Sequence, residues 1–184
     1  MAIRPYENKD KEAVRYVCLN CDGPCDMSEN AQHFILSTYC DYFIEQEPQN
    51  CFVAADENDK AVGYIICAEN YDSFIEVFRK EYFTRIPEED TVHRFYASQS
   101  TLLQEKYKDE YPAHFHIDIM PEYQRMGLGQ KLIHILLKHL KEKNVRGVML
   151  SVSTENEKGV NFYKKCGFTL LEHTSGSEAY GMTL

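Results

Sequence analysis

The sequence has no tryptophan, no surplus of basic residues and no long apolar run. Its 184 residues include 20 Lys and Arg against 29 Asp and Glu, which gives a formal net charge of -9. General binding to the phosphate backbone of nucleic acids needs clustered Lys and Arg, so a net acidic chain argues against it. We therefore expect no nucleic-acid partner.

Neither a secretory signal nor a membrane-spanning helix is indicated by the pattern. No apolar stretch follows Arg4 in the first ten residues, as a signal peptide would require. The most apolar long segment, residues 128–140, is interrupted by Lys131, His134 and Lys138, and it is too short to cross a bilayer. We expect a cytoplasmic protein with no membrane partner.

The seven cysteines do not indicate a disulfide framework, because their number is odd and no export signal accompanies them. Cys18, Cys21 and Cys25 are closely spaced, with Cys40 as the nearest fourth thiol. A structural zinc site needs four such ligands. We favour the alternative that these cysteines are small buried apolar residues, and we expect no metal.

Length and a 43% hydrophobic content favour a single domain over residues 1–184 with a substantial core. Apolar periodicity and turn residues predict both kinds of element. The predicted strands are residues 2–4, 51–55, 62–67, 113–120, 145–152, 168–172 and 178–184. The predicted helices run from Asn8 or Asp10 to about Leu19, from Ser28 through Phe43, over residues 126–143, and from a capping box at 154–157 to Gly167. We expect the last two strands to form a hairpin, and residues 178–184 are a candidate for an exposed edge strand.

Residues 69–110 differ from the rest of the chain because aromatic residues are dense there. Phe74, Phe78 and Tyr82 are spaced four apart, as on one face of a helix. This predicts a helical insertion within the domain, before the fourth strand. Two interpretations are open: an insertion packed on the core, or a lid or wall of a ligand pocket.

A strand–helix–strand unit with parallel strands is predicted over residues 113–152. Gln124-Arg-Met-Gly-Leu-Gly129 lies between its first strand and its helix. Two glycines there allow backbone N–H groups to converge on an anion at the helix N-terminus. The dinucleotide pattern fails because Leu132 replaces its third glycine, and the P-loop pattern fails because Lys131 follows Gln130.

This loop is preceded by Pro121 and followed by Asn156 and by Phe162-Tyr-Lys-Lys-Cys-Gly-Phe168. The combination resembles the GNAT superfamily of N-acetyltransferases. The resemblance is specific from about Ala113 to Glu172. It implies an α/β fold of the α+β mixed-sheet kind, with about six or seven strands flanked by helices. The phrase His-Ile-Asp-Ile-Met-Pro-Glu-Tyr-Gln is also similar to the acetyltransferase-like domain of O-GlcNAcases and its stand-alone bacterial relatives.

The resemblance also implies acetyl-coenzyme A as co-substrate. The glycine loop then holds its pyrophosphate, the preceding strand pairs with its pantetheine arm, Asn156 reaches it, and Tyr163 lies at its sulfur. The residues assigned to it are Ile119, Met120, Gln124, Arg125, Met126, Gly127, Leu128, Gly129, Gln130, Asn156 and Tyr163.

Direct acetyl transfer needs a base, because an alkyl amine is mostly protonated at neutral pH. His114, His116 and Asp118 alternate along one strand and should share a face. We rank His116 first and Asp118 second as the base, while buried hydrogen-bonded residues are an equal alternative. A backbone N–H near Ile119 or Met120 is expected to stabilise the carbonyl oxygen. Tyr163 is expected to hydrogen-bond the departing thiolate, with a plain core aromatic as the alternative.

We therefore expect an acetyl-coenzyme A-dependent N-acetyltransferase. Its acceptor would be a primary amine of a small cationic molecule or of a peptide, attacking directly in a ternary complex. A catalytically silent acyl-coenzyme A-binding or protein-interaction module of the same fold is the main alternative. Transfer to a hydroxyl, or from a longer acyl donor, is a third and weaker alternative. The sequence does not decide between a monomer and a homodimer.

Overall fold

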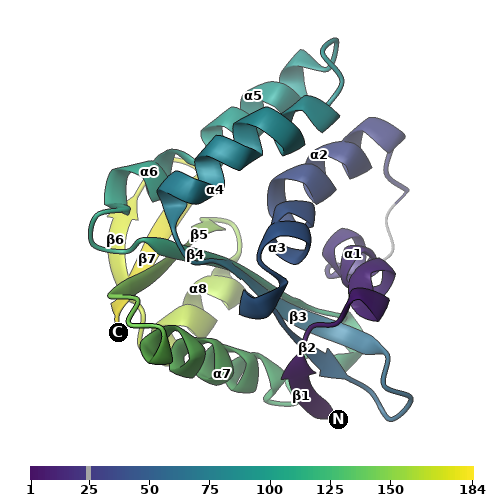
Figure 1. The fold of residues 1–184 in the computed structure, drawn as a ribbon, viewed down its shortest axis with the longest axis vertical. Coiled ribbons are helices and arrows are strands. Elements are labelled where there is room, and N and C mark those ends of the chain that lie inside the picture. Colours follow the sequence, from purple (N-terminus) through teal and green to yellow (C-terminus); the bar gives the residue numbers. More distant parts are fainter. Residues whose placement is uncertain (24–25) are drawn as a thin grey trace.

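The computed structural model describes residues 1–23 and 26–184 and has a seven-stranded mixed sheet at its centre (Figure 1). The strand order is β1-β2-β3-β4-β5-β7-β6, with β4 and β5 parallel and every other neighbouring pair antiparallel. The strands are β1 (Ala2–Pro5), β2 (Phe52–Ala55), β3 (Ala61–Ala68), β4 (Ala113–Ile119), β5 (Gly147–Ser153), β6 (Thr169–His173) and β7 (Ser177–Thr183). The predicted mixed sheet and its parallel strand–helix–strand unit are confirmed.

Helices cover both faces of this sheet (Figure 1). The longer helices are α1 (Lys11–Asn20), α2 (Glu29–Tyr39), α3 (Asp41–Gln46), α4 (Tyr71–Val77), α5 (Thr91–Gln99), α6 (Leu102–Tyr107), α7 (Leu128–Glu142) and α8 (Glu157–Lys165). Short turns of other helix types are η1 (Asn8–Asp10), η2 (Pro48–Asn50), η3 (Phe78–Tyr82), η4 (Phe83–Arg85) and η5 (Pro121–Tyr123). One core lies under α7 and α8, and the other lies under α1 to α4.

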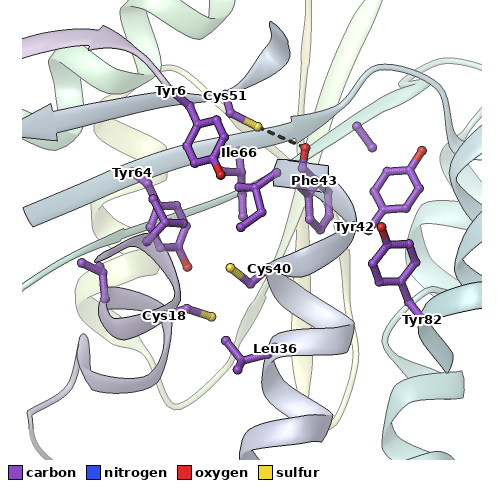
Figure 2. Packing of buried hydrophobic residues seen from close by; sticks show 14 of the residues in the cluster. Tyr6, Cys18, Leu36, Cys40, Tyr42, Phe43, Cys51, Tyr64, Ile66 and Tyr82 are labelled. Carbon is purple, nitrogen blue, oxygen red and sulfur yellow. Dashed lines mark hydrogen bonds between the residues drawn. The ribbon is translucent and has the colours of Figure 1, made fainter. Parts of the chain in front are cut away.

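The core under α1 to α4 is rich in aromatic and sulfur-containing side chains, as Figure 2 shows. Phe43 is fully buried and its carbonyl oxygen accepts a hydrogen bond from the Cys51 thiol at 3.4 Å. The six described cysteines are free thiols and most are buried, as predicted for small apolar residues. Cys25 lies outside the described residues.

The helices between β3 and β4 pack on this core. Phe74, Phe78 and Tyr82 are all buried, although the α-helix ends at Val77 and one turn of π-helix continues to Tyr82. The Tyr82 hydroxyl donates to Glu45 at 2.9 Å and accepts from Gln46 at 3.0 Å. These three aromatic residues therefore pack on the core, and they are not among the described residues that line the large cavity discussed below. The single domain over residues 1–184, with residues 69–110 as an insertion, stays a prediction.

Three local predictions were wrong. The helix predicted from Ser28 through Phe43 breaks at Cys40, whose φ of -135° turns the chain so that α3 buries Phe43 against the sheet. The cap of α8 is Asn156 and not Thr154, because the Asn156 carboxamide oxygen accepts from Gly159 N at 2.8 Å. Residues 178–184 are not an edge, since β7 lies between β5 and β6.

Candidate active site

The main cavity has a volume of about 710 Å³ and opens where β4 ends and α7 begins. Three parts of the chain supply its walls: the end of α1, the β4–α7 region and α8. The lining residues are Cys21, Asp22, Ile117, Asp118, Ile119, Gln124, Arg125, Gly127, Leu128, Gly129, Gln130, Asn156, Lys158, Gly159, Asn161, Phe162, Tyr163 and Lys165.

The glycine loop forms the N-terminal end of α7. Gly127 is the N-cap with a φ of 77°, a left-handed conformation that a side chain disfavours. Among the residues that the structure describes, no side chain caps this helix, so the first-turn N–H groups of Leu128, Gly129 and Gln130 depend on another acceptor. These residues line the cavity, which makes the helix end suitable for an anion.

Three cationic side chains line the same cavity: Arg125 from the loop, and Lys158 and Lys165 from α8. Sequence reasoning missed the two lysines, although their spacing of seven places them on one helix face after Asn156. Together with the helix end they supply the positive charge that a phosphorylated ligand needs, despite the net charge of -9. The residues present therefore fit the phosphates of acetyl-coenzyme A.

Gln124 fixes the loop rather than standing free. Its Nε2 donates to the Ile119 carbonyl oxygen at 2.9 Å and to the Cys21 carbonyl oxygen at 3.2 Å. The side chain thus ties the end of β4 to the end of α1, two segments a hundred residues apart. This contact holds the end of α1 near the cavity, where Cys21 and Asp22 are lining residues that the sequence did not assign to the co-substrate.

The strand edge facing the cavity is open. The described pairing of β4 with β5 covers Ala113 and His114, whereas β4 pairs with β3 as far as Ile119. Met120 N donates to Val62 O at 2.9 Å, so its N–H points toward β3. Because successive strand residues point their N–H groups in opposite directions, the Ile119 N–H points away from β3. Of the two candidate donors, Ile119 is the one with an N–H on the open side.

Asp118 lines the cavity and accepts a hydrogen bond from a residue of the neighbouring strand β3. Tyr64 is its register partner on β3, and the Tyr64 hydroxyl donates to Asp118 Oδ2. Burial raises the pKa of Asp118 above its ordinary value, and Asp22 adds to this rise, while Tyr64 and Cys21 oppose it by hydrogen bonding. A carboxyl group with a raised pKa is better matched to proton transfer near neutral pH than an ordinary aspartate.

Tyr163 faces the same cavity from α8. Burial, first, and then the negative charge of Asp118 raise the pKa of Tyr163 above its ordinary value. The hydroxyl therefore stays protonated over the physiological range and can donate a hydrogen bond. The structure thus brings Tyr163 and Asp118 together at one cavity, from elements more than 40 positions apart.

His114 and His116 share the Asp118 face, as predicted, but among the described residues neither lines this cavity. The His116 ring packs edge-to-face on Tyr39 and Phe43, at centroid distances of 5.3 and 5.1 Å. Burial lowers the pKa of His116 to about 4, and burial with its neighbour His116 lowers the pKa of His114 to about 3. His114 is buried and His116 is half-buried, and both rings pack on aromatic side chains. The alternative of buried hydrogen-bonded residues is not met by His114, whose Nδ1 has no partner within the described chain.

Two residues assigned to the co-substrate are not among the lining residues of the cavity. Met120 belongs to the core under α1 to α4, and Met126, within the glycine loop, is 53% exposed. The remaining assigned residues all line the cavity. Within residues 1–23 and 26–184, no three His, Cys, Asp or Glu side chains are grouped so as to hold a metal ion.

The family model that matches the chain is the acetyltransferase (GNAT) family, over residues 18–168. The chain belongs to this family. Its predicted class, an acetyl-coenzyme A-dependent N-acyltransferase, is the class of this family and agrees with the relatives that follow.

Three curated relatives show how far this similarity extends. N-alpha-acetyltransferase 30 of Schizosaccharomyces pombe is 24% identical over 143 residues, 78% of this chain and 70% of the relative. Protein O-GlcNAcase of Rattus norvegicus is 24% identical over 90% of this chain, which spans 20% of that protein. Mycothiol acetyltransferase of Paenarthrobacter aurescens is 40% identical over 52 residues, 28% of this chain and 16% of the relative. The predicted similarity to O-GlcNAcases is confirmed, and the chain spans only a small part of two of these relatives.

Solved structures show the same fold. SsHAT superposes with a TM-score of 0.84 at 24% identity, covering 99% of this chain and 97% of that one. PaiA N-acetyltransferase from Thermoplasma acidophilum, solved in complex with coenzyme A, gives a TM-score of 0.61 at 16% identity over 100% of this chain and 98% of that one. The helices of the described chain include none that is both long enough and apolar enough to cross a bilayer.

Proposed function

We propose that this protein transfers an acetyl group from acetyl-coenzyme A to a primary amine by direct attack in a ternary complex. The observation that carries this proposal is the convergence of Asp118, Tyr163 and the glycine loop on one cavity. A site for a phosphorylated donor, a carboxyl base and a phenol acid are the groups that this chemistry needs.

Acetyl-coenzyme A supplies the activated acetyl thioester when it is bound. The backbone N–H groups at the start of α7, with Arg125, Lys158 and Lys165, bind its phosphates. The Ile119 N–H, on the open edge of β4, stabilises negative charge on the carbonyl oxygen.

Asp118 removes the proton from the amine, and Tyr163 donates a hydrogen bond to the departing sulfur. A phenol is a stronger base than a thiolate when ionised, so full proton transfer from Tyr163 is uphill. A strong hydrogen bond, with proton transfer completed late, is the role that fits its raised pKa.

The acceptor is proposed to be cationic in its free form. Asp22 and Asp118 line the cavity together with the Cys21 thiol, whereas the lining cations come from the loop and α8. The carboxylates attract an ammonium group to their part of the cavity. The name of N-alpha-acetyltransferase 30 agrees with an amine acceptor, and small amines and peptide amines both satisfy this requirement. A cytoplasmic location is proposed on the free thiols.

Two measurements test the function. A thermal-shift titration with acetyl-coenzyme A tests donor binding, and release of free thiol is followed with a panel of small amines, peptides and matched alcohols. We expect stabilisation by the donor and thiol release with amines only. Donor binding without thiol release from any acceptor would favour the silent module, and release with alcohols would assign O-acetyl transfer.

A further inference from the structure

A second cavity, of about 10 Å³, lies where the helices between β3 and β4 meet the sheet. Its walls include Thr38 from α2, Gln104 from α6, and His114 and His116 from β4. None of its described lining residues lines the main cavity, so the two cavities are separate in the described part of the chain.

Three residues that line this cavity each have a buried polar atom without a partner. Thr38 Oγ1, Gln104 Oε1 and His114 Nδ1 have no hydrogen-bond partner within the described chain. The three residues are only 3%, 6% and 3% exposed, so bulk water does not satisfy them. Folded proteins pair the great majority of such atoms, and three orphans around one space indicate a shared missing partner.

The size and chemistry of the space select the partner. A volume of about 10–15 Å³ accommodates a single water molecule and little else. The described lining contains no carboxylate, so nothing there would compensate the charge of a cation. A carboxamide oxygen and an imidazole nitrogen accept hydrogen bonds, whereas a threonine hydroxyl both donates and accepts.

We propose that this cavity is the binding site of one ordered water molecule. The water donates to Gln104 Oε1 and to His114 Nδ1, with His114 as the Nε2–H tautomer, and accepts from the Thr38 hydroxyl. These three hydrogen bonds are the usual number for a buried water. The water connects α2, α6 and β4, the strand that also carries Asp118.

The test combines structure and stability. A high-resolution crystal structure of the unaltered protein should show the water between the three side chains, and water-to-protein Overhauser contacts in solution should show it to be long-lived. Thr38→Val and Gln104→Leu should each raise the unfolding equilibrium constant about tenfold. The double variant should raise the unfolding equilibrium constant by less than the product of the two single effects, because both substitutions remove hydrogen bonds to the same water.

Gln99→Leu is the matched control, since Gln99 is exposed on the neighbouring helix α5 and should change little. An empty cavity in the crystal structure, or a Gln104→Leu variant as stable as the unaltered protein, would overturn the proposal. The crystal and Overhauser measurements need no variant, so a substitution that prevents folding does not remove the test.

Discussion

The Tyr64 hydroxyl donates a hydrogen bond to the Asp118 carboxylate from the adjacent strand, and the two residues are paired in register. Tyr64 is fully buried, whereas Asp118 faces the main cavity. The sheet itself therefore aims the candidate base, and a buried phenol favours its ionised form.

Tyr64→Phe should move the acidic limb of the pH profile of kcat/KM upward. In the unaltered protein the hydrogen bond from Tyr64 lowers the pKa of Asp118. Its removal therefore raises that pKa and leaves less ionised carboxylate at a given pH. A hydrogen bond to a charged group is worth about 1.5–3 kcal/mol, which corresponds to about one to two pH units. Activity should recover at high pH. Tyr42→Phe is the control, because it removes the tyrosine hydroxyl that donates to Glu47 in the same core. An acidic limb that does not move in Tyr64→Phe would argue against the role of Tyr64.

Asp118→Asn and His116→Gln should separate the two candidate bases. We expect Asp118→Asn to lower kcat/KM by about 10²-fold or more and to abolish the acidic limb, because the carboxylate at the cavity is lost. His116→Gln should retain the limb, because the ring packs on Tyr39 and Phe43 away from that cavity. Full pH–rate profiles of both variants measure this, and loss of the limb in His116→Gln alone would assign the base to His116.

Tyr163→Phe should lower kcat by about 10²-fold and leave the dissociation constant for acetyl-coenzyme A almost unchanged. The variant keeps the ring that packs on Phe162 and removes only the hydroxyl. Calorimetric titration and steady-state kinetics measure the two quantities. Tyr180→Phe, whose hydroxyl donates to Glu178 at 2.5 Å, is the matched control. Equal turnover in the unaltered protein and Tyr163→Phe would reduce Tyr163 to a packing residue.

Gly129→Ala should strain the contact between α7 and α8. A Cβ at this position would lie 2.9 Å from Phe162 Cζ, closer than Cβ atoms normally approach, and 3.1 Å from Cε2, which is tighter than most contacts. We expect a loss of about 1–3 kcal/mol in unfolding free energy and weaker donor binding. Phe162→Leu in the same chain should relieve part of the loss, and Gly176→Ala, with nothing within 4 Å of its Cβ, should be nearly neutral. Denaturant unfolding of Gly129→Ala, Phe162→Leu, the double variant and Gly176→Ala measures the coupling. If the unfolding free energy changes of the two single variants simply add in the double variant, the two residues do not share a contact.

Acidification should destabilise the protein over a window set by His114 and His116. Their folded pKa values of about 3 and about 4 lie below the ordinary value of 6.5, so the unfolded state binds more protons as the pH falls. The stabilisation is present above pH 6.5 and is lost as the pH falls toward 4, at about 1.4 kcal/mol per pH unit for each imidazole. Urea unfolding at stepped pH values measures the slope, which should be smaller in His116→Gln. If His116→Gln has the same slope as the unaltered protein, then His116 has the same pKa in the folded and the unfolded state.

The sequence alone determined the parts of the site that depend on neighbouring residues. Two glycines between a strand and a helix indicated a loop whose backbone N–H groups can meet an anion, and the alternation in residues 113–120 placed His114, His116 and Asp118 on one face. Gly127 has a φ of 77°, which glycine favours, although Arg125 in the same loop also has a positive φ. Backbone sterics, strand alternation and helix spacing act over a few residues, so they can be recognised along the chain.

Tertiary structure decided the rest. Which member of the His116 and Asp118 pair meets the cavity depends on Tyr39 and Phe43, which cover one of them, and on Tyr64, which aims the other. Cys21 reaches the cavity through a hydrogen bond spanning 103 positions. Solvent exposure and pKa follow from desolvation by elements that are distant in sequence, and no local pattern contains that information.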